Sequence, residues 1–285
     1  MSYLKVTLID VGWGDSILIE ASDKNGSRPR FALIDANDSE HNNYLPSWTF
    51  LRKHFGSREN EFDTRKPFFD FIMLSHDHAD HGSGLMRVMK KYGTNKFWYS
   101  KSRIRRGSVL PDLIAYVNNG RVQISHQAID NGINIGKLGD IDMDVMWPQP
   151  DQIDPNPNNN SIVLSLKVHN TTFLLTGDAE GRVWDQIASD IPDNISFLKV
   201  PHHGSENGTI YHRGTPWVDR LDDIQPPTHL GISCHPNFPG RYKFPNTNVL
   251  KRFDERPYPC YRTDMHYHIT FTADFSGVRV KYSHE

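Results

Sequence analysis

Cysteine is scarce in this sequence, since Cys234 and Cys260 are the only two among 285 residues. Small secreted domains rely on several disulfides, so two cysteines exclude a disulfide scaffold and favour a reducing compartment. The N-terminus also lacks the basic start, apolar stretch and small-residue cleavage site of a secretory signal. Together these absences predict a cytoplasmic protein.

Long apolar runs are absent as well. No run approaches the roughly 18 apolar residues of a membrane-spanning helix, so we expect no membrane partner. The formal net charge is −2. This value excludes the strongly basic balance of a general nucleic-acid coat, although it allows a local basic patch. Nothing in the sequence indicates an oligomeric state.

Internal repeats and long linkers are also missing. Residues 3–9, 16–21 and 30–36 are rich in β-branched residues and are joined by turns, which predicts an antiparallel meander. Helical spacing in 44–55 and strand-like runs in both halves of the chain predict an α/β fold. We expect one mixed α/β domain over residues 1–285.

The stretch HDHADH, residues 76–81, follows directly after an apolar run of strand length. His76 and His78 alternate and therefore share a face on an extended backbone, while Asp80 and His81 follow where the chain enters a helix. Zinc takes imidazole nitrogen and carboxylate oxygen, and two ions about 3.5–4 Å apart can act together on a substrate. A solvated polar loop is the alternative, but this crowding after a buried strand favours a metal site.

Two later stretches have the same design. FLLTGD places Asp178 at the end of an apolar strand, and FLKVPHHGS places His202 and His203 in the same way. Alone, Asp178 also fits a helix cap, and a histidine pair also fits a polar surface loop. Together with HDHADH they predict two neighbouring metal sites.

The stretch KFWYSKSRIRRG, residues 96–107, interleaves aromatic and basic residues. Two interpretations stay open. The stretch can follow a nucleic-acid backbone and stack bases on its aromatic rings. Equally, it can be a strand followed by a solvated basic loop.

HDHADH matches the HxHxDH signature of the metallo-β-lactamase-fold hydrolases. The chain also contains, in an order that resembles the hydrolase domain of ComEC-type competence proteins, the stretches VTLIDVGWGDSILIE, FALIDA, NNNSIVLSL, FLLTGDAE, FLKVPHHGS and YRTD. The resemblance covers residues 3 to about 272. It implies a metallo-β-lactamase fold, a four-layer αββα sandwich of two mixed β-sheets with the metals at one edge.

The resemblance also implies two divalent metal ions and a set of ligands. The implied ligands are His76, His78, Asp80, His81, Asp178 and His203. The first ion takes His76 and His78, and Asp178 bridges the two ions. His203 is favoured over His202 because the family's ligand histidine stands just before glycine. Zinc is the first expectation, with manganese and iron as alternatives.

Three residues are implied as catalytic: Asp80, His202 and His235. His202 would line the pocket or donate a proton. Phe244 stands where the family pattern has a histidine, and His235 is a nearby substitute. The alternative for His235 is a capped loop residue beside a buried Cys234 thiol.

The sequence departs from the common pattern at the first metal. No third histidine can be placed there, since His126 and His169 fall in other elements and Asn160 stands nearer the expected position. Asp35 and Asp15 match family positions that orient ligand histidines through hydrogen bonds. Both also fit turn aspartates that bond their own backbone.

The function implied is a metal-dependent hydrolase, a two-metal phosphodiesterase and more narrowly a nuclease, in which a metal-bridging hydroxide attacks a phosphodiester. Its expected partner is a phosphodiester substrate, with nucleic acid as the specific case. One alternative is a lactonase or thioesterase on the same site. Another is a non-catalytic metal-binding or regulatory protein of the same fold.

Overall fold

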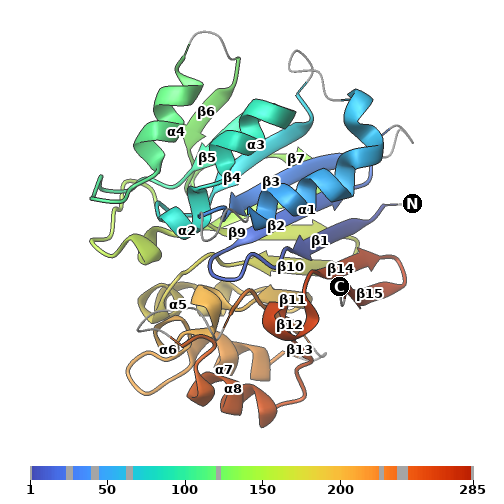
Figure 1. The fold of residues 1–285 in the computed structure, drawn as a ribbon. Helices are drawn as coiled ribbons and strands as arrows, with labels where there is room; N and C mark the ends of the chain where they lie inside the picture. The colour runs from blue at the N-terminus through green and yellow to red at the C-terminus, as the bar shows by residue number, and fades with distance from the viewer. Residues whose placement is uncertain are drawn as a thin grey trace.

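The computed structural model describes residues 2–23, 28–39, 45–61, 67–119, 123–224, 228–235 and 243–283. In Figure 1, four layers follow one another from top to bottom: helices, a β-sheet, a second β-sheet and helices again. Both sheets contain parallel and antiparallel pairs. The predicted α/β class and four-layer αββα sandwich are therefore confirmed.

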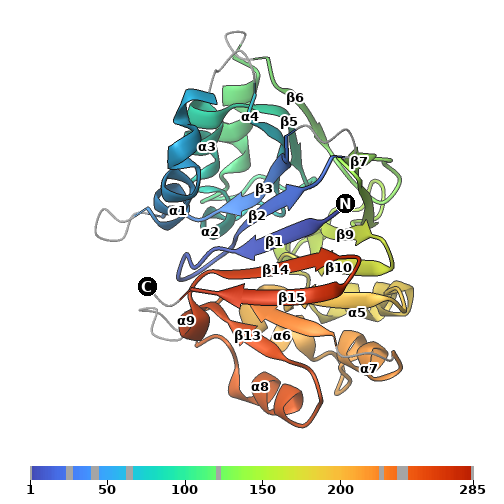
Figure 2. The ribbon, with the colours of Figure 1, turned by 90° about the vertical axis from the view of Figure 1, so that its right-hand side faces the viewer.

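The first sheet has eight strands within the described residues, in the order β15-β14-β1-β2-β3-β4-β5-β6. Its strands are β1 (Leu4–Leu8), β2 (Ser16–Ala21), β3 (Arg30–Ala36), β4 (Phe69–Leu74), β5 (Thr94–Tyr99), β6 (Ser125–Ala128), β14 (Ile269–Asp274) and β15 (Gly277–Tyr282). The meander β1-β2-β3 is antiparallel as predicted, and β3 to β6 run parallel. β14 pairs with β1, so early and late parts of the chain share this sheet (Figure 2).

The second sheet has seven strands in the described part of the chain, in the order β13-β12-β11-β10-β9-β8-β7. Its strands are β7 (Lys137–Leu138), β8 (Ile141–Trp147), β9 (Val163–Val168), β10 (Thr171–Leu175), β11 (Ile195–Lys199), β12 (His229–Ile232) and β13 (Cys260–Arg262). β9 and β10 form an antiparallel hairpin. β10 and β11 are parallel, so their carboxyl ends reach the same edge.

The main apolar core lies between the two sheets. Strands with one face inward alternate: in β8, residues 141, 143, 145 and 147 are buried while 142 and 144 are exposed. Phe173 and Phe271 pack on either side of Phe197, with ring centroids 5.1 Å and 4.1 Å from its own. This core holds both sheets in one relative position.

The outer layers consist of short helices. The helices are α1 (Pro46–Phe55), α2 (Ala79–Gly82), α3 (Leu85–Tyr92), α4 (Leu110–Val117), α5 (Gly181–Ile187), α6 (Glu206–Thr209), α7 (Pro216–Asp222), α8 (Thr247–Asp254) and α9 (Thr263–His266), with 3-10 turns at Gly56–Glu61, Pro157–Asn160, Ala188–Asp190 and Pro201–Gly204. α1, α3 and α4 pack on the first sheet, and α5, α7 and α8 pack on the second. No helix in the described ranges is long and apolar enough to cross a bilayer.

Loops from both sheets meet at one edge of the sandwich. The turn after β1 passes under the start of α2, where the N–H of Asp15 donates to the carbonyl of Asp80 at 3.3 Å. Gly14 has a φ of +85°, and a Cβ at this position would lie 2.0 Å from the same carbonyl oxygen. Only glycine fits, so the GWGDS turn is shaped by its contact with the HDHADH segment.

Replacing Phe197 with alanine should destabilise the fold by about 3–5 kcal/mol, because the ring is fully buried between the sheets. The matched control is Phe275→Ala, since that ring is 69% exposed, and it should change the free energy of unfolding by less than about 0.5 kcal/mol. Urea unfolding followed by circular dichroism measures both. Equal effects in the two variants would contradict this packing.

Candidate metal centre

Four groups of acidic and histidine side chains come together where the loops of the two sheets meet. Within each group, one ligand atom per residue lies within 4.8 Å of the others. The groups are His76/His81/Asp178, Asp80/His81/His203, Asp15/Asp178/His203 and Asp15/Asp35/His81. His81 occurs in three groups, and Asp15, Asp178 and His203 occur in two each, so these four residues form the middle of the cluster.

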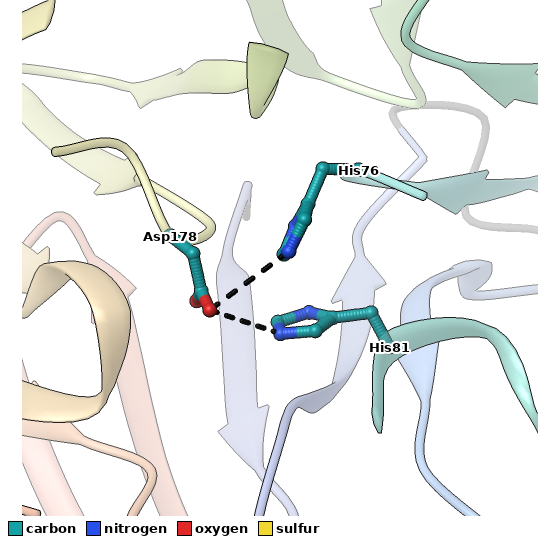
Figure 3. A group of neighbouring side chains, drawn as sticks. All are labelled: His76, His81 and Asp178. Atoms are coloured by element: carbon teal, nitrogen blue, oxygen red, sulfur yellow. Dashed lines mark ion pairs between the residues drawn. The ribbon is translucent and has the colours of Figure 1, made fainter. Parts of the chain in front are cut away.

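Asp178 is the meeting point of histidines from separate segments. Its Oδ2 lies 3.3 Å from Nε2 of His81, 3.3 Å from Nε2 of His203 and 3.9 Å from Nε2 of His76. In Figure 3, the imidazoles of His76 and His81 point toward this carboxylate from the opposite loop. The turn that carries it is fixed by Ser161, whose Oγ accepts from the N–H of Asp178 at 3.0 Å.

His81 is held in one orientation by Asp35. The Oδ2 of Asp35 accepts from Nδ1 of His81 at 2.8 Å, while Ser75 donates to both carboxylate oxygens through its N–H and its hydroxyl. With Nδ1 occupied, the lone pair of Nε2 faces Asp178, and this buried atom has no hydrogen-bond partner. The expected orienting role of Asp35 is confirmed.

His203 has the same arrangement on the other sheet. Its Nδ1 donates to the carbonyl of Ser233 at 2.9 Å, which leaves its buried Nε2 without a hydrogen-bond partner. The backbone of His202 and His203 is left-handed, with φ of 47° and 55°. Such conformations cost about 1–3 kcal/mol each and occur where the surroundings impose them. The surrounding structure thus imposes an unfavourable backbone conformation here, and this conformation orients the His203 ring.

The charges in the cluster shift the pKa values strongly. Burial favours neutral imidazole, but the carboxylates of Asp178 and Asp35 outweigh it and raise the pKa of His81 well above its ordinary value. For Asp178, burial is outweighed by His203 and His81, so its pKa falls well below the ordinary range. Burial, assisted by the charge on His81, lowers the pKa of His76. Protons on the imidazoles therefore balance the carboxylate when no cation is bound.

The unpartnered atoms fit a metal ion. Nε2 of His81, Nε2 of His203 and Oδ1 of Asp178 are buried and lack hydrogen-bond partners, although buried polar atoms are usually paired. Their donor types are those that zinc, manganese or iron accept. His81, His203 and Asp178 would hold a metal ion through these atoms. The role of each predicted ligand as a metal ligand stays a prediction.

At the first predicted metal site, the two predicted ligand histidines contact each other. Nε2 of His76 lies 3.0 Å from Nδ1 of His78, so these two rings contact each other. The candidates for a third histidine lie elsewhere: His126 contacts the side chain of Asn118, and His169 contacts the carbonyl of Ser2. Among the described residues, His76 joins a ligand group with His81 and Asp178, whereas His78 joins none.

Asn160 does not provide a replacement ligand. Its Oδ1 accepts from the N–H of Asp154 at 2.7 Å, and its Nδ2 donates to the carbonyls of Asp154 and Asn156. The side chain therefore holds the loop before β9 in shape.

His202 lies beside the cluster with its ring partly exposed. Its Nε2 is 3.8 Å from Oδ2 of Asp178, and its Nδ1 is 3.4 Å from Oε1 of Glu180. Glu180 is itself held by the amides of Asn156 and Asn158, each at 2.8 Å. His202 is therefore suited to meet a substrate at the mouth of the site.

His235 is not brought into any ligand group of the described residues. It interacts electrostatically with Asp10. Phe244 instead packs beside His202, with ring centroids 5.5 Å apart, and stacks on Trp13 at 5.2 Å. Cys234 is a buried thiol whose Sγ contacts Asp264 at 3.2 Å. The catalytic role assigned to His235 stays a prediction.

Sequence reasoning missed Lys199, which is the last residue of β11. Its side chain is fully buried, and its Nζ lies 2.7 Å from Oδ2 of Asp15 and 4.0 Å from Oδ1 of Asp178. It also donates to the carbonyl of Gly177 at 3.0 Å. A lysine inside the apolar run FLKV was the available signal, because a buried lysine needs a partner. Asp15 is thus a charge partner, 3.7–3.8 Å from the rings of His203 and His81.

A sequence model described as the metallo-beta-lactamase superfamily matches residues 69–212, about half of the chain. This segment runs from β4 to just beyond α6 and contains nearly all of the cluster. The chain therefore belongs to the metallo-β-lactamase superfamily.

Two curated relatives identify the branch. The chain is 26% identical to ComE operon protein 3 of Bacillus subtilis over 269 residues, which is 91% of this chain and 32% of that protein. It is 26% identical to Recombination protein 2 of Haemophilus influenzae over 181 residues, 64% of this chain and 19% of that protein. The resemblance to ComEC-type proteins is confirmed, and the chain spans a third or less of these relatives.

Solved structures share the fold. Unliganded yeast PDE1 superposes with a TM-score of 0.53 at 11% identity, covering 95% of this chain and 99% of that one. CmlA, a diiron beta-hydroxylase from Streptomyces venezuelae, gives a TM-score of 0.52 at 10% identity, covering 99% and 54%. At these identities the comparison shows the fold alone.

The exchange Asp178→Asn should abolish high-affinity metal binding, because it removes the charge at the centre of the cluster. Zinc at about 100 times its dissociation constant should stabilise the wild type by about 2.7 kcal/mol and the variant far less. Metal analysis and thermal unfolding with and without zinc measure this. Asp142→Asn, at an exposed carboxylate, is the control, and equal zinc stabilisation of both variants would refute the cluster as a metal site.

Replacing Lys199 with methionine should cost about 3–5 kcal/mol, because it leaves the carboxylate of Asp15 buried without its ion-pair partner. The double variant Lys199→Met/Asp15→Asn should recover part of this loss. Urea unfolding in EDTA separates the effect from metal binding. A single variant within about 0.5 kcal/mol of the wild type would show that the pair contributes no stability.

Proposed function

We propose that this chain is a two-metal phosphodiesterase. The observation that carries the proposal is the set of overlapping ligand groups, two of which contain Asp178, so two ions bound there would share this carboxylate. Paired ions of this kind stabilise the attacking and leaving oxygens of a displacement at phosphorus. When bound, they also lower the pKa of a coordinated water to about 7 and so supply the nucleophile.

The protein's own residues would orient the ligand histidines and protonate the leaving oxygen. Asp35 and the carbonyl of Ser233 keep the Nε2 atoms of His81 and His203 turned to the site. His202, whose Nδ1 lies 3.4 Å from Oε1 of Glu180, would donate a proton to the leaving oxygen. Within the described residues, no cysteine lies among the ligand groups, and burial raises the pKa of the Cys234 thiol. Covalent catalysis by Cys234 is therefore disfavoured.

Several features support a phosphodiester over a lactone or thioester. The chain is similar to ComEC-type proteins over most of its length. The first predicted site lacks the third histidine that lactone- and thioester-cleaving relatives usually have. The site is also flanked by an exposed basic segment, Arg103 to Arg106.

The test is metal content and hydrolysis of bis-p-nitrophenyl phosphate by the wild type and His76→Ala, with zinc or manganese added back. The wild type should hold about two ions per chain and turn over the substrate. His76→Ala should lose more than about 10²-fold, because residues that merely orient ligands are already worth 10–100-fold.

His126→Ala is the matched control, since His126 lies on β6 outside the cluster, and it should behave as wild type. Two ions without turnover would redirect the search to lactones and thioesters. No bound metal under any condition would refute the proposal and favour a non-catalytic role.

A further inference from the structure

The basic segment is fastened to the metal-binding turn. The rim loop, defined as residues 100–109, connects β5 to α4. Near one end, Ser102 donates its hydroxyl to Oδ2 of Asp77 at 3.2 Å. At the other end, the N–H groups of Val109 and Leu110 donate to Oδ1 of Asp77 at 2.8 Å and 2.9 Å. Asp77 stands between His76 and His78, so both ends of the rim loop are held against the predicted ligands.

The rim loop also reaches the loop that supports His202. Lys101 forms an ion pair with Asp151 at 3.0 Å, and Arg105 donates to the carbonyl of Pro155. In Figure 1, the green loop before α4 and the yellow-green loop before β9 accordingly lie at the same edge of the sandwich. The residues that follow Pro155 hold Glu180 beside His202. The basic loop therefore borders both parts of the site.

The tip of the rim loop carries positive charge that the described protein does not neutralise. Arg103 and Arg106 are exposed, and neither forms an ion pair within the described residues. Ile104 between them is 78% exposed. An otherwise slightly acidic chain thus presents two free guanidinium groups beside a site that would bind a phosphate.

The aromatic part of the stretch does not share this surface. Phe97 and Trp98 are buried, and Tyr99 is half-buried against Phe97. Base stacking on Phe97 and Trp98, one of the two interpretations left open by the sequence, is therefore excluded, because both rings are buried in strand β5. The loop offers charge without an aromatic platform, which suits phosphates rather than bases.

We propose that the rim loop binds backbone phosphates of a nucleic-acid strand on one side of the scissile bond. As a statement about a substrate, this rests on the proposed phosphodiesterase function. Arg103 and Arg106 lie at the exposed tip of the rim loop, between the contacts with Asp77 that fasten its two ends, so they would act on a part of the substrate away from the reacting phosphorus. A small diester has no such part, whereas a strand has a phosphate at every nucleotide.

The experiment compares Arg103→Gln/Arg106→Gln with the control Lys251→Gln/Lys281→Gln. The control removes the same charge from exposed positions on α8 and on β15, the far edge strand of the first sheet. Binding of a fluorescein-labelled single-stranded DNA oligonucleotide is measured by anisotropy in EDTA over a range of salt concentrations. Hydrolysis of the oligonucleotide and of bis-p-nitrophenyl phosphate is measured with metal.

The rim-loop variant should bind the oligonucleotide at least about tenfold more weakly at low salt. Its slope of log K against log salt should fall in magnitude by about 1.4, that is, about 0.7 for each lost phosphate contact. The ratio of kcat/KM for the oligonucleotide to that for the small diester should fall about tenfold, mainly through KM. The control should match the wild type.

Oligonucleotide binding and salt dependence equal to the wild type in the rim-loop variant would overturn the inference. The inference would also be overturned if the rim-loop variant lost binding to vesicles of anionic phospholipid but kept its binding to the oligonucleotide. That result would point to a membrane surface as the ligand. Failure of the proposed function is distinguishable, because a wild type that cleaves neither substrate can still reveal rim-loop binding in EDTA.

Discussion

The burial of negative charge at the meeting edge of the two sheets is the constraint on which the rest of the structure depends. Asp15, Asp35 and Asp178 are all almost completely buried. A buried carboxylate without a partner costs several kcal/mol, so each needs compensation. Lys199 compensates Asp15 and His81 compensates Asp35. Asp178 is surrounded by imidazoles, whose protons a metal ion would replace.

This constraint explains how the fold is used. β4 leads to His76, β10 to Asp178 and β11 to His203, so three strands from two sheets deliver the cluster at one edge. The inter-sheet core fixes the spacing of these strands. The turns that follow the strands adopt unfavourable backbone conformations to bring the side chains together. The left-handed backbone at Asp35, His202 and His203 shows where the turns are forced. Strain of this kind persists when packing on both sides over-determines it.

The sequence predicted the fold class, the opening meander and the segments that form the cluster. These features are local, because apolar runs and alternation report strands, and HDHADH reports ligands through spacing alone. Lys199 and Glu180 were missed because their roles depend on partners from other segments, such as Asp15 and Asn158. Whether Phe244 or His235 approaches the site was likewise not decidable, since the answer lies in loop packing. The packing places Phe244 beside His202.

The net charge of the chain is small, but acidic and basic side chains are concentrated in different parts of the site. The interior of the site is acidic, and its rim carries Arg103 and Arg106. Without cations, Lys199 and the protons on His81 and His203 offset the buried carboxylates, so the interior offers a phosphate little attraction. Bound divalent ions would make the interior positive, and interior and rim would then attract the same ligand. We therefore expect metal loading to strengthen the binding of an anionic substrate beyond what the rim supplies without metal. The net charge of −2 excluded a nucleic-acid coat, but it says nothing about a site whose sign depends on its metals.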